Sequence, residues 1–245
     1  MDLELNKKRA LVMGSSSGIG KAIAKSLIQE GAEVYLCSRN EEKLKMTMEE
    51  VGAQGYQVCD LSKSGSTQNM IESFLEQHGT LDILVTNTGG PQKGNFMEVT
   101  DEQWNTDFQS LWMSPVEAMK AVLPSMQKNN YGRIIMVTSI AAKEPLAGLT
   151  TSNGLRAGLS GLAKSVANEY SQYGITLNLL LPGYTNTDRL KALNLADEKV
   201  KEMVPAGRLA DPEELADLAT FLASKKGAYI TGQSISIDGG VLKGH

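Results

Sequence analysis

The sequence predicts a single α/β domain over residues 1–245, built on a doubly wound parallel sheet with helices on both faces. Short apolar runs typical of buried strands alternate with helical patterns along the whole chain. No linker, internal repeat or low-complexity segment interrupts this alternation. Because parallel strands need long crossover connections, strands separated by helices indicate a parallel sheet covered on both sides.

The individual elements follow from local patterns. Strand-like runs occupy residues 9–13, 33–37, 55–59, 81–85, 133–138, 176–181 and 234–237. Residues 21–30 have helical periodicity, and Gly31 follows as a helix-ending residue. Thr100 opens the capping box T-D-E-Q, and Asp211 precedes a proline and two glutamates, the pattern of a helix start. We therefore expect helices to begin at both positions.

The composition narrows the class of protein. The chain has 41% hydrophobic residues, 24 glycines and only 7 prolines, which suits tight turns between strands and helices. A net charge of −4 gives no reason to expect nucleic acid or an acidic membrane surface as a partner. No apolar run approaches the roughly 20 residues needed to span a bilayer, and residues 1–9 lack the apolar core of a secretory signal. We expect a cytoplasmic protein, with Cys37 and Cys59 as reduced core thiols rather than a disulfide.

The first strand-like run leads into a glycine-rich turn, G-S-S-S-G-I-G at residues 14–20, and then into a helix. Glycines allow the backbone to approach phosphates closely, and free N–H groups at a helix start face negative charge. This predicts a dinucleotide diphosphate site. Its expected residues are Gly14, Ser16, Ser17, Gly18, Ile19 and Gly20. The alternative is a glycine-rich turn without a ligand.

Residues after the next strands favour the cofactor interpretation, because ligands of such sheets lie beyond the carboxyl ends of the strands. Ser38 and Arg39 follow the second strand, where no acidic residue is present to accept from a ribose 2′-hydroxyl. An arginine there can bind a 2′-phosphate, which favours NADP(H) over NAD(H); a solvated arginine is the alternative. Asp60 and Leu61 follow the third strand, and that carboxylate either accepts from the adenine amino group or caps the next helix.

Further motifs extend from the fourth strand to the end of the chain. They are the Asn87-x-Gly89 turn, Gly132-Arg133-Ile134-Ile135 leading to Ser139, Asn178, the segment 182–187 (P-G-Y-T-N-T), Tyr229-Ile230-Thr231-Gly232-Gln233 and Asp238-Gly239-Gly240. With these motifs the chain resembles the short-chain dehydrogenase/reductase family, most of all its 3-oxoacyl-(acyl-carrier-protein) reductases. The resemblance implies a Rossmann-type fold and hydride transfer between NADP(H) and a carbonyl or alcohol substrate, with a 3-oxoacyl thioester among the candidates. It also implies that Asn87 and Gly89 adjoin the cofactor, and that Pro182, Gly183, Thr185 and Thr187 contact its nicotinamide carboxamide and phosphates.

The resemblance fails at the family's catalytic positions, which are a Ser, a Tyr-x-x-x-Lys pair and an upstream Asn. Ser139 matches the Ser, but Ser152 stands at the Tyr position and Arg156 at the Lys position. Leu111 replaces the Asn. A serine hydroxyl is a far weaker acid than a phenol, while an arginine keeps a fixed positive charge that can bind ribose hydroxyls and stabilise an alkoxide.

Two functions from different classes follow. One is an altered reductase in which Ser139, Ser152, a water molecule and Arg156 form the catalytic cluster, with Arg156 also touching the cofactor. The other is an NADP(H)-binding sensor or partner subunit that has lost its chemistry. A dehydration or epimerisation on the same fold is a third option. Tyr184, Lys143 and Glu144 are the other proton donors considered, and no His, Cys or carboxylate cluster has metal-ligand spacing.

The substrate side and the assembly give weaker signals. Residues 187–205 suggest a helical lid whose apolar side chains face a substrate; these are Leu190, Leu193, Met203 and Val204, with Met97 and Leu146 opposite. The helix expected at 152–171 carries a face of small residues, Gly154, Gly158, Gly161 and Ser165. Either the protein's own sheet or, as the resemblance implies, a second copy packs closely there. We expect a homo-oligomer, a dimer or a tetramer.

Overall fold

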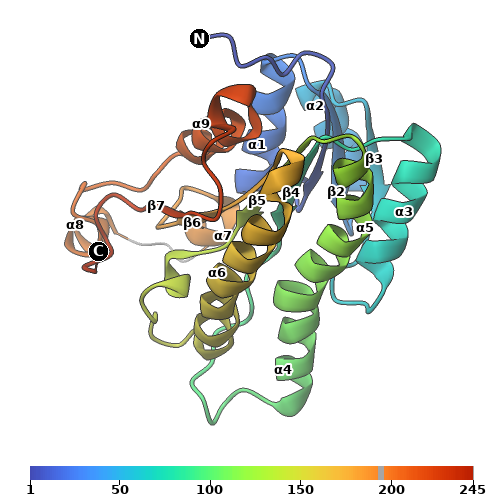
Figure 1. Ribbon diagram of the computed structural model, residues 1–245. Coiled ribbons are helices and arrows are strands. Elements are labelled where there is room, and N and C mark those ends of the chain that lie inside the picture. The colour runs from blue at the N-terminus through green and yellow to red at the C-terminus, as the bar shows by residue number, and fades with distance from the viewer. Residues whose placement is uncertain (193–195, 245) are drawn as a thin grey trace.

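A computed structural model describes residues 1–192 and 196–244, and its centre is one parallel sheet (Figure 1). The strand order is β3-β2-β1-β4-β5-β6-β7. The strands are β1 (Arg9–Met13), β2 (Glu33–Ser38), β3 (Gly55–Val58), β4 (Ile83–Asn87), β5 (Gly132–Val137), β6 (Ile175–Pro182) and β7 (Ser234–Ile237). The order reverses between β1 and β4, which pair with Ala10 opposite Ile83. A ligand crevice is expected at the carboxyl ends of those two strands.

The helices cover both faces of the sheet. They are α1 (Gly18–Gln29), α2 (Glu41–Val51), α3 (Ser66–His78), α4 (Asp101–Asp107), α5 (Ser114–Lys128), α6 (Thr150–Tyr170), α7 (Asp188–Lys191), α8 (Asp197–Met203) and α9 (Pro212–Ala223). Side chains of α1, α2 and α9 pack together with one face of the sheet, and those of α3, α5 and α6 with the other. The doubly wound α/β fold predicted from the sequence is confirmed.

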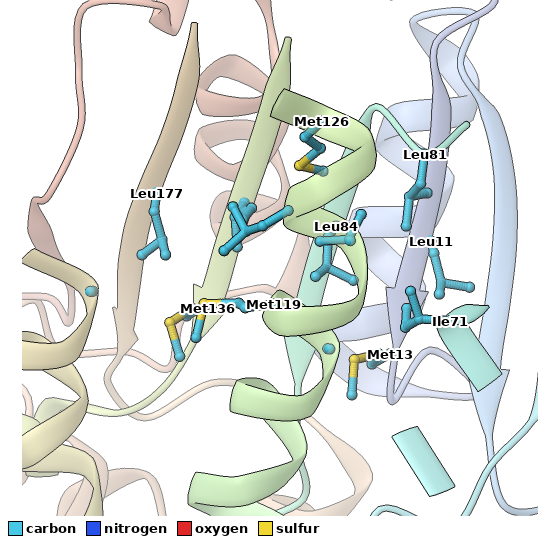
Figure 2. Close-up of a cluster of buried hydrophobic side chains, with 14 of the residues drawn as sticks. Leu11, Met13, Ile71, Leu81, Leu84, Met119, Met126, Met136 and Leu177 are labelled. Atoms are coloured by element: carbon cyan, nitrogen blue, oxygen red, sulfur yellow. The ribbon is translucent and has the colours of Figure 1, made fainter. Parts of the chain in front are cut away.

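Each face of the sheet has its own apolar core. Figure 2 shows part of the core under α3 and α5, where Met119 and Met126 approach the sheet from α5. Strand residues such as Leu84 and Leu177 belong to the same core and are fully buried. Burial of this kind stabilises a fold by about 25 cal/mol per Å² of apolar surface, and here it fixes the strand ends where the site forms.

The structure agrees with most predicted boundaries and changes some. The first and last strands lie as predicted, and β4 ends two residues later than expected, at Asn87. The segment proposed as a lid contains the short helices α7 and α8; Leu193, one of the side chains expected to face a substrate, lies outside the described residues. Cys37 and Cys59 are buried and unbridged, as expected.

Candidate active site

Two adjoining cavities lie along the carboxyl edge of the sheet. The first has a volume of about 1010 Å³ and the second of about 400 Å³. Both are lined by Gly14 and Ser17 after β1 and by the turn Gly89, Gly90 and Pro91 after β4. Together they form one groove across the point where the strand order reverses, the place predicted for a dinucleotide.

The glycine turn after β1 is shaped for close approach. Gly14 and Gly18 have positive φ angles of 60° and 55°, which favour glycine. The side-chain amide of Asn87 donates to the Gly14 carbonyl at 3.0 Å, and a Cβ at Gly20 would collide with both groups. Gly20 lines neither cavity. A glycine is needed there because the Gly14 carbonyl and the Asn87 amide lie too close for a side chain.

Helix α1 begins at this turn without a side-chain cap. Ser17 occupies the N-cap position and its side chain accepts no hydrogen bond there, and the first turn has no acidic residue. The first N–H groups of a helix lack intrahelical acceptors, so those of α1 are free to bind an anion. Ser17, Gly18 and Ile19 line the second cavity and Ser16 the first. The turn fits a diphosphate.

The first cavity has a basic end. Ser38 and Arg39, two of the residues expected to bind the cofactor, line it together with Asn40 and Lys43. Asn40 caps α2 by accepting from the Lys43 N–H at 2.9 Å, which places Lys43 one turn from Arg39. Two cations at this end fit a 2′-phosphate.

Asp60 and Leu61 also line the first cavity. The Asp60 carboxylate accepts from the Ser62 hydroxyl at 2.7 Å and from the Ser62 N–H at 3.1 Å, and these bonds lower the pKa of Asp60. The alternative in which Asp60 caps the next helix is wrong, because α3 begins at Ser66 with Gly65 as its N-cap. Asp60 stays available for an adenine amino group.

The second cavity gathers the three positions expected to carry the chemistry. Ser139 follows β5, and its hydroxyl accepts from the Ala141 N–H at 3.2 Å, which leaves its own hydrogen free to donate. Ser152 and Arg156 lie one turn apart on α6, and each is only 4% exposed. All three line the same cavity.

Arg156 has an unusual environment for a buried charge. Among residues 1–192 and 196–244 its guanidinium has no ion-pair partner within 4.0 Å, and its buried Nε has no hydrogen-bond partner. Burial, and secondly the charge of Arg189, lower the pKa of Arg156 to about 10. An unpaired buried charge is costly. The free N–H groups of Arg156 are therefore placed to bind the hydrogen-bond acceptors of a ligand.

The start of α6 is fixed by a contact that the sequence did not reveal. The Thr151 hydroxyl donates to the Asp107 carboxylate at the end of α4 at 2.7 Å, and both residues are buried. This bond holds the residue next to Ser152. Leu111 lies in the following π-helical turn, is 1% exposed and packs in the core, so it brings no polar group to the cavity.

Several predicted residues lie elsewhere. Pro182, Gly183 and Thr187 line the second cavity, but Thr185 does not; it is buried, and its hydroxyl donates to the Gly183 carbonyl at 3.3 Å. Glu144 accepts from the Lys243 and Gly244 N–H groups at 2.7 and 2.6 Å, so it anchors the C-terminal segment.

Other candidates are absent from the lining of both cavities: the proton donors Tyr184 and Lys143, and the apolar residues Met97, Leu146, Leu190, Met203 and Val204. Val204 is instead buried, and a Cβ at Gly239 would touch it. Of the apolar side chains expected to face a substrate, the structure thus places Val204 in the interior, and the others that it describes lie outside the lining of the two cavities.

Sequence reasoning also missed residues that the groove contains. Arg189 and Lys43 line it and were not singled out. For Lys43, the spacing of four from Arg39 at a helix start was an available signal. Arg189 had none, because its place depends on a contact with Pro91, 98 residues away.

Comparison with known proteins decides the family. The family described as Enoyl-(Acyl carrier protein) reductase matches residues 14–242. The 3-oxoacyl-[acyl-carrier-protein] reductase of Vibrio harveyi is 37% identical over 243 residues, which cover 98% of this chain and 99% of that protein. The chain belongs to the short-chain dehydrogenase/reductase family. The resemblance drawn from the sequence motifs is thereby confirmed.

Solved structures of this family match throughout. YwfH, an NADPH-dependent reductase involved in bacilysin biosynthesis, superimposes with a TM-score of 0.93 at 32% identity, covering 98% of this chain and all 100% of that one. The L-sorbose reductase of Gluconobacter frateurii, solved with NADPH and L-sorbose, gives a TM-score of 0.93 at 30% identity over 100% of both chains. The predicted preference for NADP(H) agrees with these relatives.

Other classes of site find no support in the described part of the chain. Within it, no group of three or more His, Cys, Asp or Glu side chains is arranged to hold a metal ion. Among its helices, none combines the length and apolar character needed to cross a bilayer.

Proposed function

We propose that the protein is an NADP(H)-dependent oxidoreductase that transfers a hydride between the nicotinamide and a carbonyl or alcohol substrate. The observation that carries this proposal is the buried, unpaired Arg156, which shares a cavity with the Ser139 and Ser152 hydroxyls. Burying an unpaired charge costs free energy, so we expect Arg156 to take part in ligand binding or catalysis. Family membership makes redox chemistry on a carbonyl the first candidate for that use.

Different parts of the groove would bind different parts of the cofactor. The uncapped start of α1, with Ser16, Ser17, Gly18 and Ile19, would hold the diphosphate. Arg39, Ser38 and Lys43 would bind the 2′-phosphate, and Asp60 and Leu61 would border the adenine. Asn87, Gly89, Pro182, Gly183 and Thr187 would border the nicotinamide half. When bound, NADPH supplies the hydride.

Three side chains of the protein would bind the substrate oxygen and stabilise its charge. The Ser139 and Ser152 hydroxyls donate hydrogen bonds to it, and the Arg156 guanidinium stabilises the negative charge that develops there. Neither serine is acidic enough to release a proton outright, so the proton comes through a serine-bound water that Ser152, being smaller than a tyrosine, leaves room for. Arg156 cannot relay the proton but can bind ribose hydroxyls.

A non-catalytic NADP(H)-binding protein is the second candidate. The specific observation in its favour is that no phenol lines the second cavity among the described residues. Such a protein would bind NADPH tightly and act as a sensor or as a partner subunit.

One experiment separates the two. NADPH oxidation is followed over a panel of ketones, aldehydes, oxo acids and 3-oxoacyl thioesters, with Ser139→Ala and Arg156→Ala as test variants. Ser165→Ala is the matched control, because Ser165 lies on α6 and its exposed hydroxyl donates to the Gly161 carbonyl, outside the groove. Turnover lost in both test variants but kept in the control supports the enzyme. Tight NADPH binding without turnover on any substrate supports the sensor.

We propose in addition that the chain forms a homo-oligomer in the cytoplasm. The small-residue face of α6 is exposed, and a Cβ at Gly154 or Gly161 would meet nothing within 4 Å. The alternative in which the protein's own sheet packs on this face is therefore wrong. Gly158 is exposed as well, although a Cβ there would meet the Trp112 ring. Light scattering on eluted protein tests the assembly, and a monomeric mass would refute it.

A further inference from the structure

The second cavity holds a second guanidinium that the proposed chemistry leaves unused. Arg189 lies on α7 and reaches across the groove, where its Nη2 donates to the Pro91 carbonyl at 2.8 Å. Arg156 lines the same cavity from α6. The two charges are close enough that Arg189 contributes to lowering the pKa of Arg156.

Neither guanidinium is neutralised by the described protein. Across residues 1–192 and 196–244, no carboxylate lies within 4.0 Å of either one. Asp188 is the one acidic residue that lines this cavity; it lies beside Arg189 in α7, and both side chains are exposed. The protein's own charged groups around the cavity thus sum to one positive charge. The cofactor diphosphate proposed for Ser17, Gly18 and Ile19 shares this cavity, so the guanidinium of Arg189 has two candidate anions, the cofactor phosphates and a substrate group.

The turn after β4 is built to admit Arg189. A Cβ at Gly90 would collide with the Arg189 guanidinium, whose Cζ and Nη2 would lie 2.7 Å from it. The three atoms nearest to that Cβ all belong to the Arg189 guanidinium. A glycine at this position therefore allows the cation to lie over the groove.

Hydrogen-bond capacity points the same way. A guanidinium has five N–H donors and an ammonium three, so Arg156 keeps donors free even after it binds ribose hydroxyls. Ser152 leaves open the space that a tyrosine ring would fill. The cavity therefore offers unsatisfied donors and room at its substrate end, which suits a planar anion bound through paired N–H···O contacts.

We propose that the substrate carries a carboxylate, as a 2-oxo or 3-oxo acid does, and that Arg189 binds this carboxylate. The inference rests on the proposed oxidoreductase function. The reaction adds a hydride from NADPH and a proton from water to the C=O group, giving the hydroxy acid and NADP⁺, and the carboxylate is unchanged. Arg189 is then a specificity-determining residue and takes no part in the transfer.

The test compares acids with their neutral esters. The probes are 2-oxohexanoate and 3-oxohexanoate, their methyl esters, and 2-hexanone. We expect the kcat/KM of the preferred acid to exceed that of its ester, and Arg189→Gln to lower it by about 10- to 100-fold while ester turnover changes less than about threefold. Lys191→Gln is the matched control, because it removes the same charge from the same short helix and does not line the cavity.

A binding measurement keeps the inference separate from catalysis. Calorimetry of the acids and esters with the NADP⁺ complex measures carboxylate recognition even if no turnover occurs. The result can therefore be interpreted even if the proposed oxidoreductase function is wrong. Tighter binding of an acid that is lost in Arg189→Gln supports the inference. Equal binding of acid and ester overturns it. An equal fall of acid and ester turnover in Arg189→Gln, together with weaker NADPH binding, also overturns it and assigns Arg189 to the cofactor phosphates.

Discussion

Two buried arginines, at opposite ends of the sheet, have opposite surroundings. Arg133 and Arg156 are each 4% exposed. Arg133, at the amino end of β5, donates from Nε to the Ser224 carbonyl at 3.2 Å and from Nη1 to the Gly132 and Gly174 carbonyls at 2.9 Å. It also lies over the Tyr131 ring at 4.5 Å. Arg156, at the carboxyl end, makes no such contact with the described residues.

The difference separates a structural charge from a functional one. Burial lowers the pKa of both arginines, but only Arg133 is compensated by the fold. Removing a satisfied donor leaves buried acceptors unpaired, whereas removing an unsatisfied donor relieves a desolvation penalty. Stability and activity should therefore respond in opposite ways at the two positions.

The largest effect is expected for Arg133→Met. Three carbonyls lose their donor, so the free energy of unfolding should fall by about 3 kcal/mol. Urea denaturation measures this, and the folded fraction should keep its NADPH affinity because Arg133 lies far from the groove. A fall of less than about 1 kcal/mol would show that water replaces the lost donors and that the contrast with Arg156 is weaker than the contacts indicate.

Arg156→Met should give the opposite result. Replacing an unpaired buried charge with an apolar side chain should leave the free energy of unfolding unchanged or raise it by about 1 kcal/mol. Turnover should fall about 100-fold, because the charge that stabilises the substrate oxyanion is lost. The same denaturation assay and steady-state kinetics measure both. A large loss of stability would mean that Arg156 is compensated in solution and is structural like Arg133.

Arg39 extends the comparison to an exposed arginine that is expected to gain its partner only on binding. Arg39→Ala should weaken NADPH binding by about 10- to 100-fold through loss of the contact with the 2′-phosphate. NADH binding should change by less than about threefold, since NADH lacks that phosphate. Fluorescence titration with both cofactors gives the two affinities, and equal losses would refute the assignment.

The contrast also explains which parts of the molecule the sequence allowed us to predict. Strands and the glycine turn depend on contiguous residues, so β1 and the start of α1 were recognisable from apolar runs and glycine spacing. Arg39 was placed in the groove because it directly follows the second strand, whereas Ser139 was placed by the resemblance, at the position of the family's catalytic serine. In a parallel sheet, the residues that follow a strand lie at the ligand-binding edge, so the placement of Arg39 can be inferred from the local sequence alone.

Contacts between distant segments were not predictable in the same way. Arg189 meets Pro91 only because the chain after β6 crosses the turn after β4. The Thr151–Asp107 bond joins two helices 44 residues apart in the chain. Val204, one of the apolar side chains expected to face a substrate, is instead buried. Periodicity shows that a helix has an apolar face and leaves open what that face meets.

The smallest expected effect comes from Arg156→Lys, which keeps the charge and makes it titratable. Burial disfavours the charged form, so the pKa of the new lysine should fall below its ordinary value of about 10.4. Arg156 itself, with a pKa of about 10, stays mostly charged to about pH 9. The kcat/KM of the variant should therefore fall several-fold at alkaline pH where the wild type stays level.

Stability should move the other way in the same variant. Above the lowered pKa the unfolded chain binds more protons than the folded one at this site, so the free energy of unfolding should rise with pH relative to the wild type, up to about pH 10. Kinetics and urea denaturation from about pH 6 to about pH 9.5 measure the two trends. Opposed trends require a lysine that is buried, unpaired and needed for turnover. If activity and stability fall together as pH rises, the charge at position 156 is compensated by the fold, and the difference from Arg133 disappears.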